Sequence, residues 1–164
     1  MPVGWTAHPP GQVGVFSSYP TLDGNPGALP ITSYSGSKFA YLLSSAANDF
    51  TTLSATIDVA YAGLELSIWV WFDTFEVPAS CDQSYAAVIT LAPPSYAPGN
   101  TTTIFSVSSS AIATGSDFYG GQHGGQTGWI RVIYTFTEAG AHTITFGVDN
   151  CNDAYYNSAL AVVR

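Results

Sequence analysis

The chain has 164 residues, of which 46% are hydrophobic and only 9% are charged, a composition that predicts one folded domain over residues 1–164 and excludes a disordered tail. Eleven acidic residues against three basic ones give a formal net charge of -8, which leaves no cationic surface to bind nucleic acid or to dock on an anionic membrane. No run approaches the roughly 18 apolar residues of a membrane span, so we expect no membrane insertion.

Short runs in which aromatic and β-branched residues alternate with polar ones predict strands along the whole chain. In chain order they cover 12–18, 37–45, 50–60, 64–76, 84–92, 102–108, 128–137, 141–149 and 158–163. Breaks rich in Gly, Pro, Asn and Ser separate these runs, and Glu138-Ala139-Gly140 predicts a hairpin turn. Helical periodicity is nearly absent. The pattern therefore predicts an all-β fold, a two-sheet antiparallel β-sandwich.

The run from Leu64 to Asp73 has the clearest alternation. Leu64, Leu66, Ile68, Val70 and Phe72 share one face, and Ser67, Trp69, Trp71 and Asp73 share the other. The aliphatic face predicts the core between the two sheets. For Trp69 and Trp71 we favour a packing role, because most aromatic residues of a β-sandwich fill the core or brace strand pairs.

Several short motifs resemble one family of exported proteins. They are Pro2-Val3-Gly4-Trp5, Asp73-Thr74-Phe75-Glu76, Thr127-Gly128-Trp129, Tyr134-Thr135-Phe136, Phe146-Gly147-Val148-Asp149 and Asn157-Ser158-Ala159-Leu160. Together they resemble the β-sandwich domains of bacterial choice-of-anchor and PEP-CTERM-type surface proteins. The resemblance implies a jelly-roll-like fold, similar to carbohydrate-binding modules, and a secreted or cell-surface location. It implies no activity, and the two cysteines lie outside its common pattern.

Acidic residues gather where two predicted strands end, and both cysteines lie among them. Asp73, Glu76 and Asp82 accompany Cys81, and Asp149 and Asp153 accompany Cys151. If the cysteines pair, both loops occupy one end of the sandwich and their carboxylates converge. A hard cation that takes about six to eight oxygen ligands would remove the repulsion between them, and calcium is the natural candidate. Ordinary solvated loop acids are the alternative.

A Cys81–Cys151 disulfide would close a loop of about 70 residues and stabilise the fold by roughly 4 kcal/mol in the chain-entropy model. Two buried thiols are the alternative, and we favour the bridge because we expect an oxidising compartment.

Aromatic residues in polar or glycine-rich settings are candidates for stacking on sugar rings. They are Trp5, Tyr96, Phe118, Tyr119, Tyr155 and Tyr156, and His123 would add a hydrogen-bonding partner for hydroxyl groups. No catalytic pattern accompanies them, since the three histidines have no metal-ligand spacing and no serine lies in a Gly-x-Ser-x-Gly motif. We therefore expect no enzyme.

Two functions follow. The first is an extracellular structural or adhesive subunit that self-associates into a homo-oligomer or polymer by β-strand pairing, stabilised by calcium. Lys38 is the only lysine, so edge strands lack a common safeguard against such pairing, and residues 1–16 are the expected extended pairing arm. The alternative is a carbohydrate-binding module that recognises a polysaccharide through exposed aromatic residues.

Overall fold

The computed structural model describes residues 4–20, 30–44, 50–75, 86–94, 100–112, 125–150 and 158–163. Its elements are β1 (Trp5–His8), the 3-10 helix η1 (Pro10–Gln12), β2 (Val13–Phe16), β3 (Ser18–Tyr19), β4 (Ile31–Thr32), β5 (Phe39–Leu43), β6 (Thr51–Val59), β7 (Glu65–Thr74), β8 (Ala87–Ala92), β9 (Thr102–Val107), α1 (Ser109–Ile112), β10 (Gly125–Gln126), β11 (Ile130–Thr135), β12 (Gly140–Val148) and β13 (Ser158–Val163). All nine predicted strands are present, and each end lies within three residues of its prediction. Across the described ranges no helix is long and apolar enough to cross a membrane.

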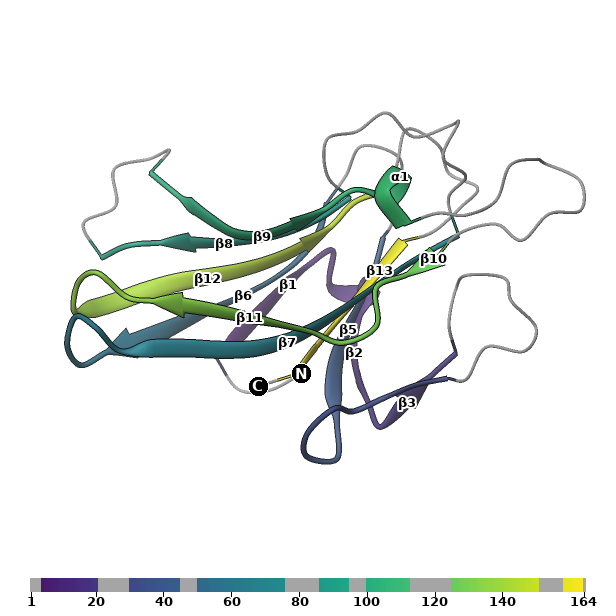
Figure 1. The fold of residues 1–164 in the computed structure, drawn as a ribbon, viewed down its shortest axis with the longest axis horizontal. Coiled ribbons are helices and arrows are strands. Elements are labelled where there is room, and N and C mark those ends of the chain that lie inside the picture. The colour runs from purple at the N-terminus through teal and green to yellow at the C-terminus, as the bar shows by residue number, and fades with distance from the viewer. Residues whose placement is uncertain are drawn as a thin grey trace, which may run out of the picture.

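Two antiparallel sheets form the body of the molecule (Figure 1). Sheet A has the order β1-β6-β12-β8-β9, and sheet B has the order β10-β7-β13-β5-β2, with β11 also paired to β7. Consecutive strands often belong to different sheets, so most partners within a sheet are distant in sequence, as in a jelly roll. The predicted all-β, jelly-roll-like sandwich is confirmed.

The turn at Glu138-Ala139-Gly140 connects the two sheets, and the predicted hairpin at this place was wrong. The strand before it, β11, pairs with β7 in sheet B, whereas β12 after it pairs with β6 and β8 in sheet A. Phe136 exchanges backbone hydrogen bonds with Gly63 and Leu64, which holds the end of β11 on sheet B. Gly140 then turns the chain toward sheet A with φ +121°, a conformation that favours glycine.

The main core lies between the sheets and follows the predicted alternation. Leu66, Ile68, Val70 and Phe72 of β7 are all at most 4% exposed. Leu160 and Val162 of β13 belong to the same cluster, which sheet A completes with Leu53, Ile89, Leu91, Ile144, Phe146 and Val148. One face of each central strand is therefore committed to holding the sandwich together.

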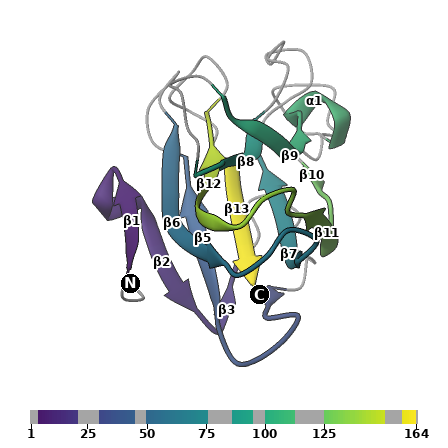
Figure 2. The same ribbon diagram turned by 90° about the vertical axis from the view of Figure 1, so that its left-hand side faces the viewer.

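The N-terminal stretch pairs within its own chain. We expected residues 1–16 as an arm for a neighbour's sheet, but β1 pairs with β6 over Trp5–His8 and β2 pairs with β5 over Val13–Phe16. The short helix η1 between them reverses the chain, so β1 joins sheet A and β2 joins sheet B along one side of the sandwich (Figure 2). Within the described residues β1 and β2 each pair on one side only, so they form the edge strands of the two sheets.

Candidate functional site

The outer face of sheet B carries a second hydrophobic cluster, separate from the core. Its buried members are Ile31, Phe39, Tyr41, Ala159, Ala161 and Val163, and Phe16, Tyr19, Leu43, Trp69, Trp71 and Trp129 pack against them. We call this set the outer-face cluster. Alternation produces it, because Trp69 and Trp71 project from β7 on the side opposite Ile68 and Val70. The two tryptophans therefore do pack, as expected, but outside the sandwich.

One part of the outer-face cluster is closed. Tyr19 of β3 stacks on Tyr41 of β5 with ring centroids 4.0 Å apart, and the Phe16 ring meets Tyr19 edge-on at 4.8 Å. Tyr41 is buried. Burial raises the pKa of Tyr41 far above its usual range, and the nearby charge of Asp73 and the proximity of Tyr19 add to the increase. In this part the half-buried rings of Phe16 and Tyr19 cover the buried Tyr41.

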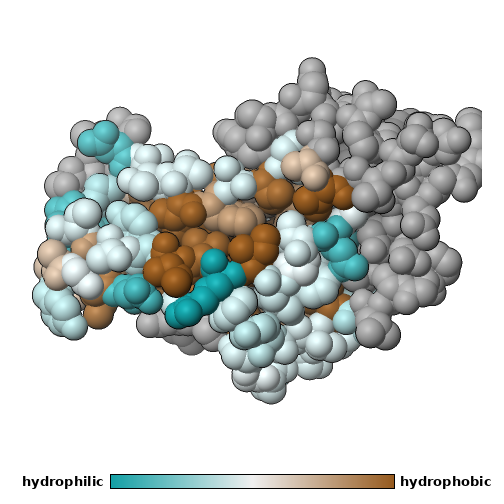
Figure 3. All heavy atoms as spheres, in the orientation of Figure 1, coloured by the Kyte–Doolittle hydropathy of each residue, from teal (hydrophilic) through white to brown (hydrophobic). Residues whose placement is uncertain are grey.

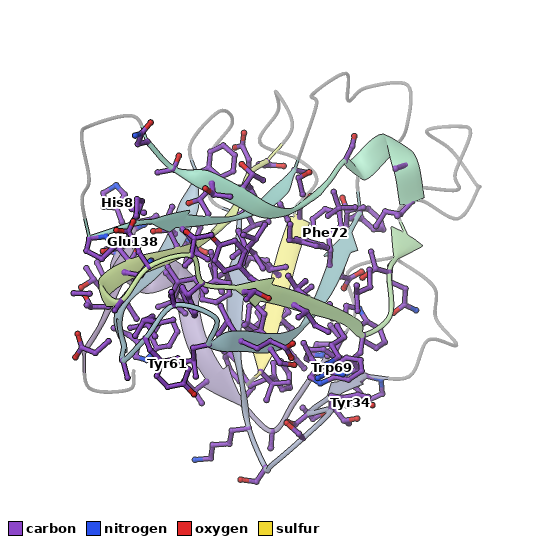
Figure 4. All side chains as sticks on the ribbon, turned by 60° about the vertical axis from the view of Figure 1, so that its left-hand side comes forward. His8, Tyr34, Tyr61, Trp69, Phe72 and Glu138 are labelled. Carbon is purple, nitrogen blue, oxygen red and sulfur yellow. The ribbon has the colours of Figure 1, made fainter. Side chains whose placement is uncertain are left out.

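The other part is open, and it centres on Tyr34 and Trp69 (Figure 4). Their rings stack with centroids 3.7 Å apart and planes at 26°. Tyr34 is 53% exposed. Since one face of its ring rests on Trp69, the exposed area belongs to the opposite face and the ring edge. Tyr34 thus presents a flat aromatic surface to solvent on a fixed support.

Trp129 borders this pair and is held from several directions. Its ring meets Trp71 edge-on at 5.8 Å and Phe39 at 6.1 Å, and its Nε1 donates a hydrogen bond to the carbonyl oxygen of Thr32 at 3.1 Å. The preceding residues anchor it to β7. The Phe72 amide donates to Thr127 Oγ1, and the Thr127 amide donates to the Phe72 carbonyl oxygen. Gly128 turns with φ +68° and delivers the tryptophan onto the outer face.

Polar groups lie beside the rings. Arg131 of β11 stands opposite Trp69 in the strand register, and its exposed side chain donates from Nε to Ser67 Oγ at 2.9 Å. The hydrogen bond orients the guanidinium, which keeps further N–H donors for other partners. Flat rings next to fixed hydrogen-bond donors can bind a ligand that has both apolar C–H faces and hydroxyl groups.

The predicted metal ligands divide into two groups. Asp73 and Asp149 are both buried and stand where β7 and β12 end, at the same end of the sandwich. Asp149 Oδ1 accepts a hydrogen bond from the Asn150 amide at 2.8 Å. Within the described residues no three His, Cys, Asp or Glu side chains form a group that could hold a metal ion. Glu76, Asp82, Asp153 and the predicted Cys81–Cys151 disulfide lie outside the described residues.

Among the predicted sugar contacts, only Trp5 lies within the described residues; Tyr96, Phe118, Tyr119, His123, Tyr155 and Tyr156 lie outside them. Trp5 packs against the main core, with its ring 5.9 Å from that of Phe146. It therefore does not belong to the outer-face cluster. Sequence reasoning did not predict Tyr34, Trp129 or Arg131 as binding residues. The alternation around Trp69 revealed the face on which they meet, but only the fold brings these three distant residues to it.

No family model matches this sequence, and no curated protein matches it. Among solved structures, the K2 cleaved adhesin domain of Lys-gingipain is 19% identical with a TM-score of 0.49, covering 99% of this chain and 90% of that one. TmCBM61 in complex with β-1,4-galactotriose is 12% identical with a TM-score of 0.46, covering 99% and 89%.

The enzymatically active domain of the bacteriophage CBA120 tailspike protein 4 is 10% identical with a TM-score of 0.46, covering 98% of this chain but 18% of that one. The structural neighbours thus include adhesin and carbohydrate-binding domains as well as part of an enzyme. At such identities and TM-scores these similarities do not assign a function. The choice-of-anchor resemblance remains an expectation from the sequence.

Proposed function

We propose that this protein is a non-catalytic carbohydrate-binding domain that takes a polysaccharide on the outer face of sheet B and works outside the cell. The stacked pair of Tyr34 and Trp69 carries the proposal, because a pyranose packs its C–H groups against an exposed aromatic face. Trp129 lies beside the stacked pair and borders the site. Arg131 and Ser67 provide groups that can hydrogen-bond to sugar hydroxyls.

The rigidity of the rings supports this function. Each ring is held by at least one other ring, and Trp129 is also held by its hydrogen bond to Thr32. A platform that is already ordered loses little conformational entropy when a ligand binds. The net charge of -8 favours a neutral polysaccharide over a polyanion.

The proposal is tested by measuring the binding of the full chain to a panel of neutral and acidic polysaccharides, by affinity electrophoresis and calorimetry. Tyr34→Ala should weaken binding to the best neutral polysaccharide at least about tenfold, which corresponds to about 1.4 kcal/mol. Tyr61→Ala is the matched control, because Tyr61 is 61% exposed and lies in the turn between β6 and β7 (Figure 4). Equal affinity of the two variants would contradict the proposed site.

Self-association by strand pairing is the second candidate function, and the strand β11 favours it. Within the described residues β11 pairs on one side only, with β7, and it exposes 38% of Ile130 and 51% of Ile133. Hydrophobic residues gather on the face of the molecule that Figure 3 shows, which is the face seen in Figure 1. A strand with such an edge can add to the sheet of a second copy. Light scattering should then detect an oligomer of the wild-type chain, and Ile133→Lys should convert this oligomer to a monomer. A wild-type chain that stays monomeric at all concentrations would contradict self-association.

We further propose that calcium binds at the end of the sandwich where β7 and β12 end. Buried Asp73 and Asp149 support it, and so does Asn150, which is 0% exposed and whose side-chain oxygen and nitrogen find no hydrogen-bond partner across the described ranges. Binding to the folded state would raise the melting temperature by mass action. Identical melting curves in calcium and in chelator would contradict the proposal.

A further inference from the structure

The outer face of sheet B continues along β7 and β11, past the stacked pair of Tyr34 and Trp69 (Figure 1). Val163 at the end of β13 pairs with Trp69, so beyond this row the described part of sheet B consists of β7 and β11 alone. Opposite residues, and residues two apart on a strand, share one side of a sheet. Two opposing pairs therefore project on the same side as Trp69, and we call them the ribbon face: Ser67 with Ile133, and Glu65 with Thr135.

The ribbon face is accessible to solvent and takes no part in the main core. Ile133 is 51% exposed, and Glu65 and Thr135 are exposed as well. Their neighbours Leu66 and Val132 turn to the other side, where they are buried in the core at 4% and 7% exposure. Substitutions on the ribbon face should therefore change the surface without unfolding the sandwich.

Arg131 connects the aromatic rings to the ribbon face. It stands opposite Trp69 in the register, but its Nε donates to Ser67 Oγ at 2.9 Å, and Ser67 belongs to the next row along β7. This hydrogen bond draws the guanidinium away from its own row and toward Glu65, which lies one row further in the same direction. The rings and the ribbon face thus form one continuous surface.

The side chains of this surface suit a sugar. Glu65 can only accept hydrogen bonds and Arg131 can only donate them, whereas the hydroxyl groups of Ser67 and Thr135 do both. Sugar hydroxyl groups also donate and accept, and the exposed methyl groups of Ile133 can pack against sugar C–H groups. The charges of Glu65 and Arg131 have opposite signs and offset each other, so this surface favours a neutral sugar over an acidic one.

The ribbon face adds enough length for a further sugar. A strand rises about 3.3 Å per residue, so the four residues from Trp69 to Glu65 span about 13 Å, which is longer than one pyranose ring. We propose that the site has a second subsite on the ribbon face and that the polysaccharide chain lies along β7. One sugar stacks on Tyr34, and a following sugar lies over Ile133, between Arg131 and Glu65. This inference rests on the proposed function and adds the direction and minimum length of the ligand.

The test is a calorimetric titration of the full chain with neutral oligosaccharides of increasing length, cut from the polysaccharide that binds best. Wild-type affinity should rise with length until both subsites are filled. Glu65→Gln and Ile133→Thr should each reduce this gain at least about tenfold, whereas Tyr34→Ala should weaken binding at every length. Asp58→Asn is the matched control, because it removes an exposed carboxylate from β6 in the other sheet and should leave the gain unchanged.

The second subsite and the proposed function fail in different ways. If Tyr34→Ala weakens binding but Glu65→Gln and Ile133→Thr keep the full gain with length, the second subsite is overturned and polysaccharide binding stands. A wild-type affinity that does not rise with length has the same meaning. If Ile133→Thr changes the oligomeric state in light scattering but not the gain, Ile133 belongs to a subunit contact and the subsite is overturned. If no oligosaccharide or polysaccharide binds the wild type, both proposals fall.

Discussion

The two faces of β7 differ sharply, although one strand makes both. The inner face presents Ile68, Val70 and Phe72 to the core, where they are at most 3% exposed. The outer face presents Trp69 and Trp71 to a cluster that stays partly open. Aliphatic side chains fill a closed interior, whereas stacked rings keep a rigid shape even when one side meets water. The comparison teaches that hydrophobic residues of one strand can serve stability on one face and, in the function that we propose, recognition on the other.

The largest effect should come from the inner face. Phe72→Ala removes a fully buried ring and leaves a cavity in the main core, so the free energy of unfolding should fall by about 3–5 kcal/mol. Chemical denaturation followed by far-ultraviolet circular dichroism measures the change. A loss below about 1 kcal/mol would mean that Phe72 does not hold the sandwich together as described.

Trp69→Ala should affect polysaccharide binding more than stability, whereas Phe72→Ala should mainly reduce stability. It removes the support of Tyr34, so we expect polysaccharide affinity to fall at least about tenfold, or about 1.4 kcal/mol. Stability should fall less than in Phe72→Ala, because the tryptophan is only half-buried. Calorimetric titration and denaturation of the same samples separate the two effects. If Trp69→Ala unfolds the chain as readily as Phe72→Ala does, the distinction between the faces fails.

The smallest effect at neutral pH should come from Tyr41→Phe, in the closed part of the outer-face cluster. The hydroxyl group of Tyr41 is buried and finds no hydrogen-bond partner in the described part of the chain, so its removal should cost little. The difference should appear in alkali. The pKa of Tyr41 is raised above its ordinary value of 10.0, so the folded state holds this proton more tightly than the unfolded state does.

The sign of the alkaline effect follows from that difference. The stability linked to the Tyr41 proton is fully present below pH 10.0 and is lost as the pH rises toward the folded-state pKa. Melting temperatures measured across this window should fall more steeply for the wild type than for Tyr41→Phe. Parallel curves would show that Tyr41 does not titrate differently in the folded and unfolded states.

The strands could be predicted from the sequence because alternation is a local signal. The run from Leu64 to Asp73 displays both of its faces in ten letters, and the structure keeps them. Strand partners could not be predicted in this way, since β7 pairs with β13 and β11, both far along the chain. The turn before Gly140 was misjudged for the same reason: a tight turn fits a hairpin and a crossing between sheets equally well.

The open part of the outer-face cluster depends on the same non-local contacts. Tyr34 lies in a Ser- and Gly-rich segment without periodicity, and Trp129 follows a left-handed glycine. Neither position carries a sequence signal that points to Trp69. The predicted sugar contacts were chosen instead by their polar surroundings. Of these residues Trp5 packs against Phe146, and the others lie outside the described residues.

The most direct test follows the indole N–H signals of the four tryptophans by nuclear magnetic resonance during titration with the oligosaccharide that binds best. Each signal is assigned by a Trp→Phe variant. The signals of Trp69 and Trp129 should shift in a saturable manner, and that of Trp5 should stay in place. Shifts confined to Trp5, or saturable binding that moves neither Trp69 nor Trp129, would contradict recognition on the outer face of sheet B.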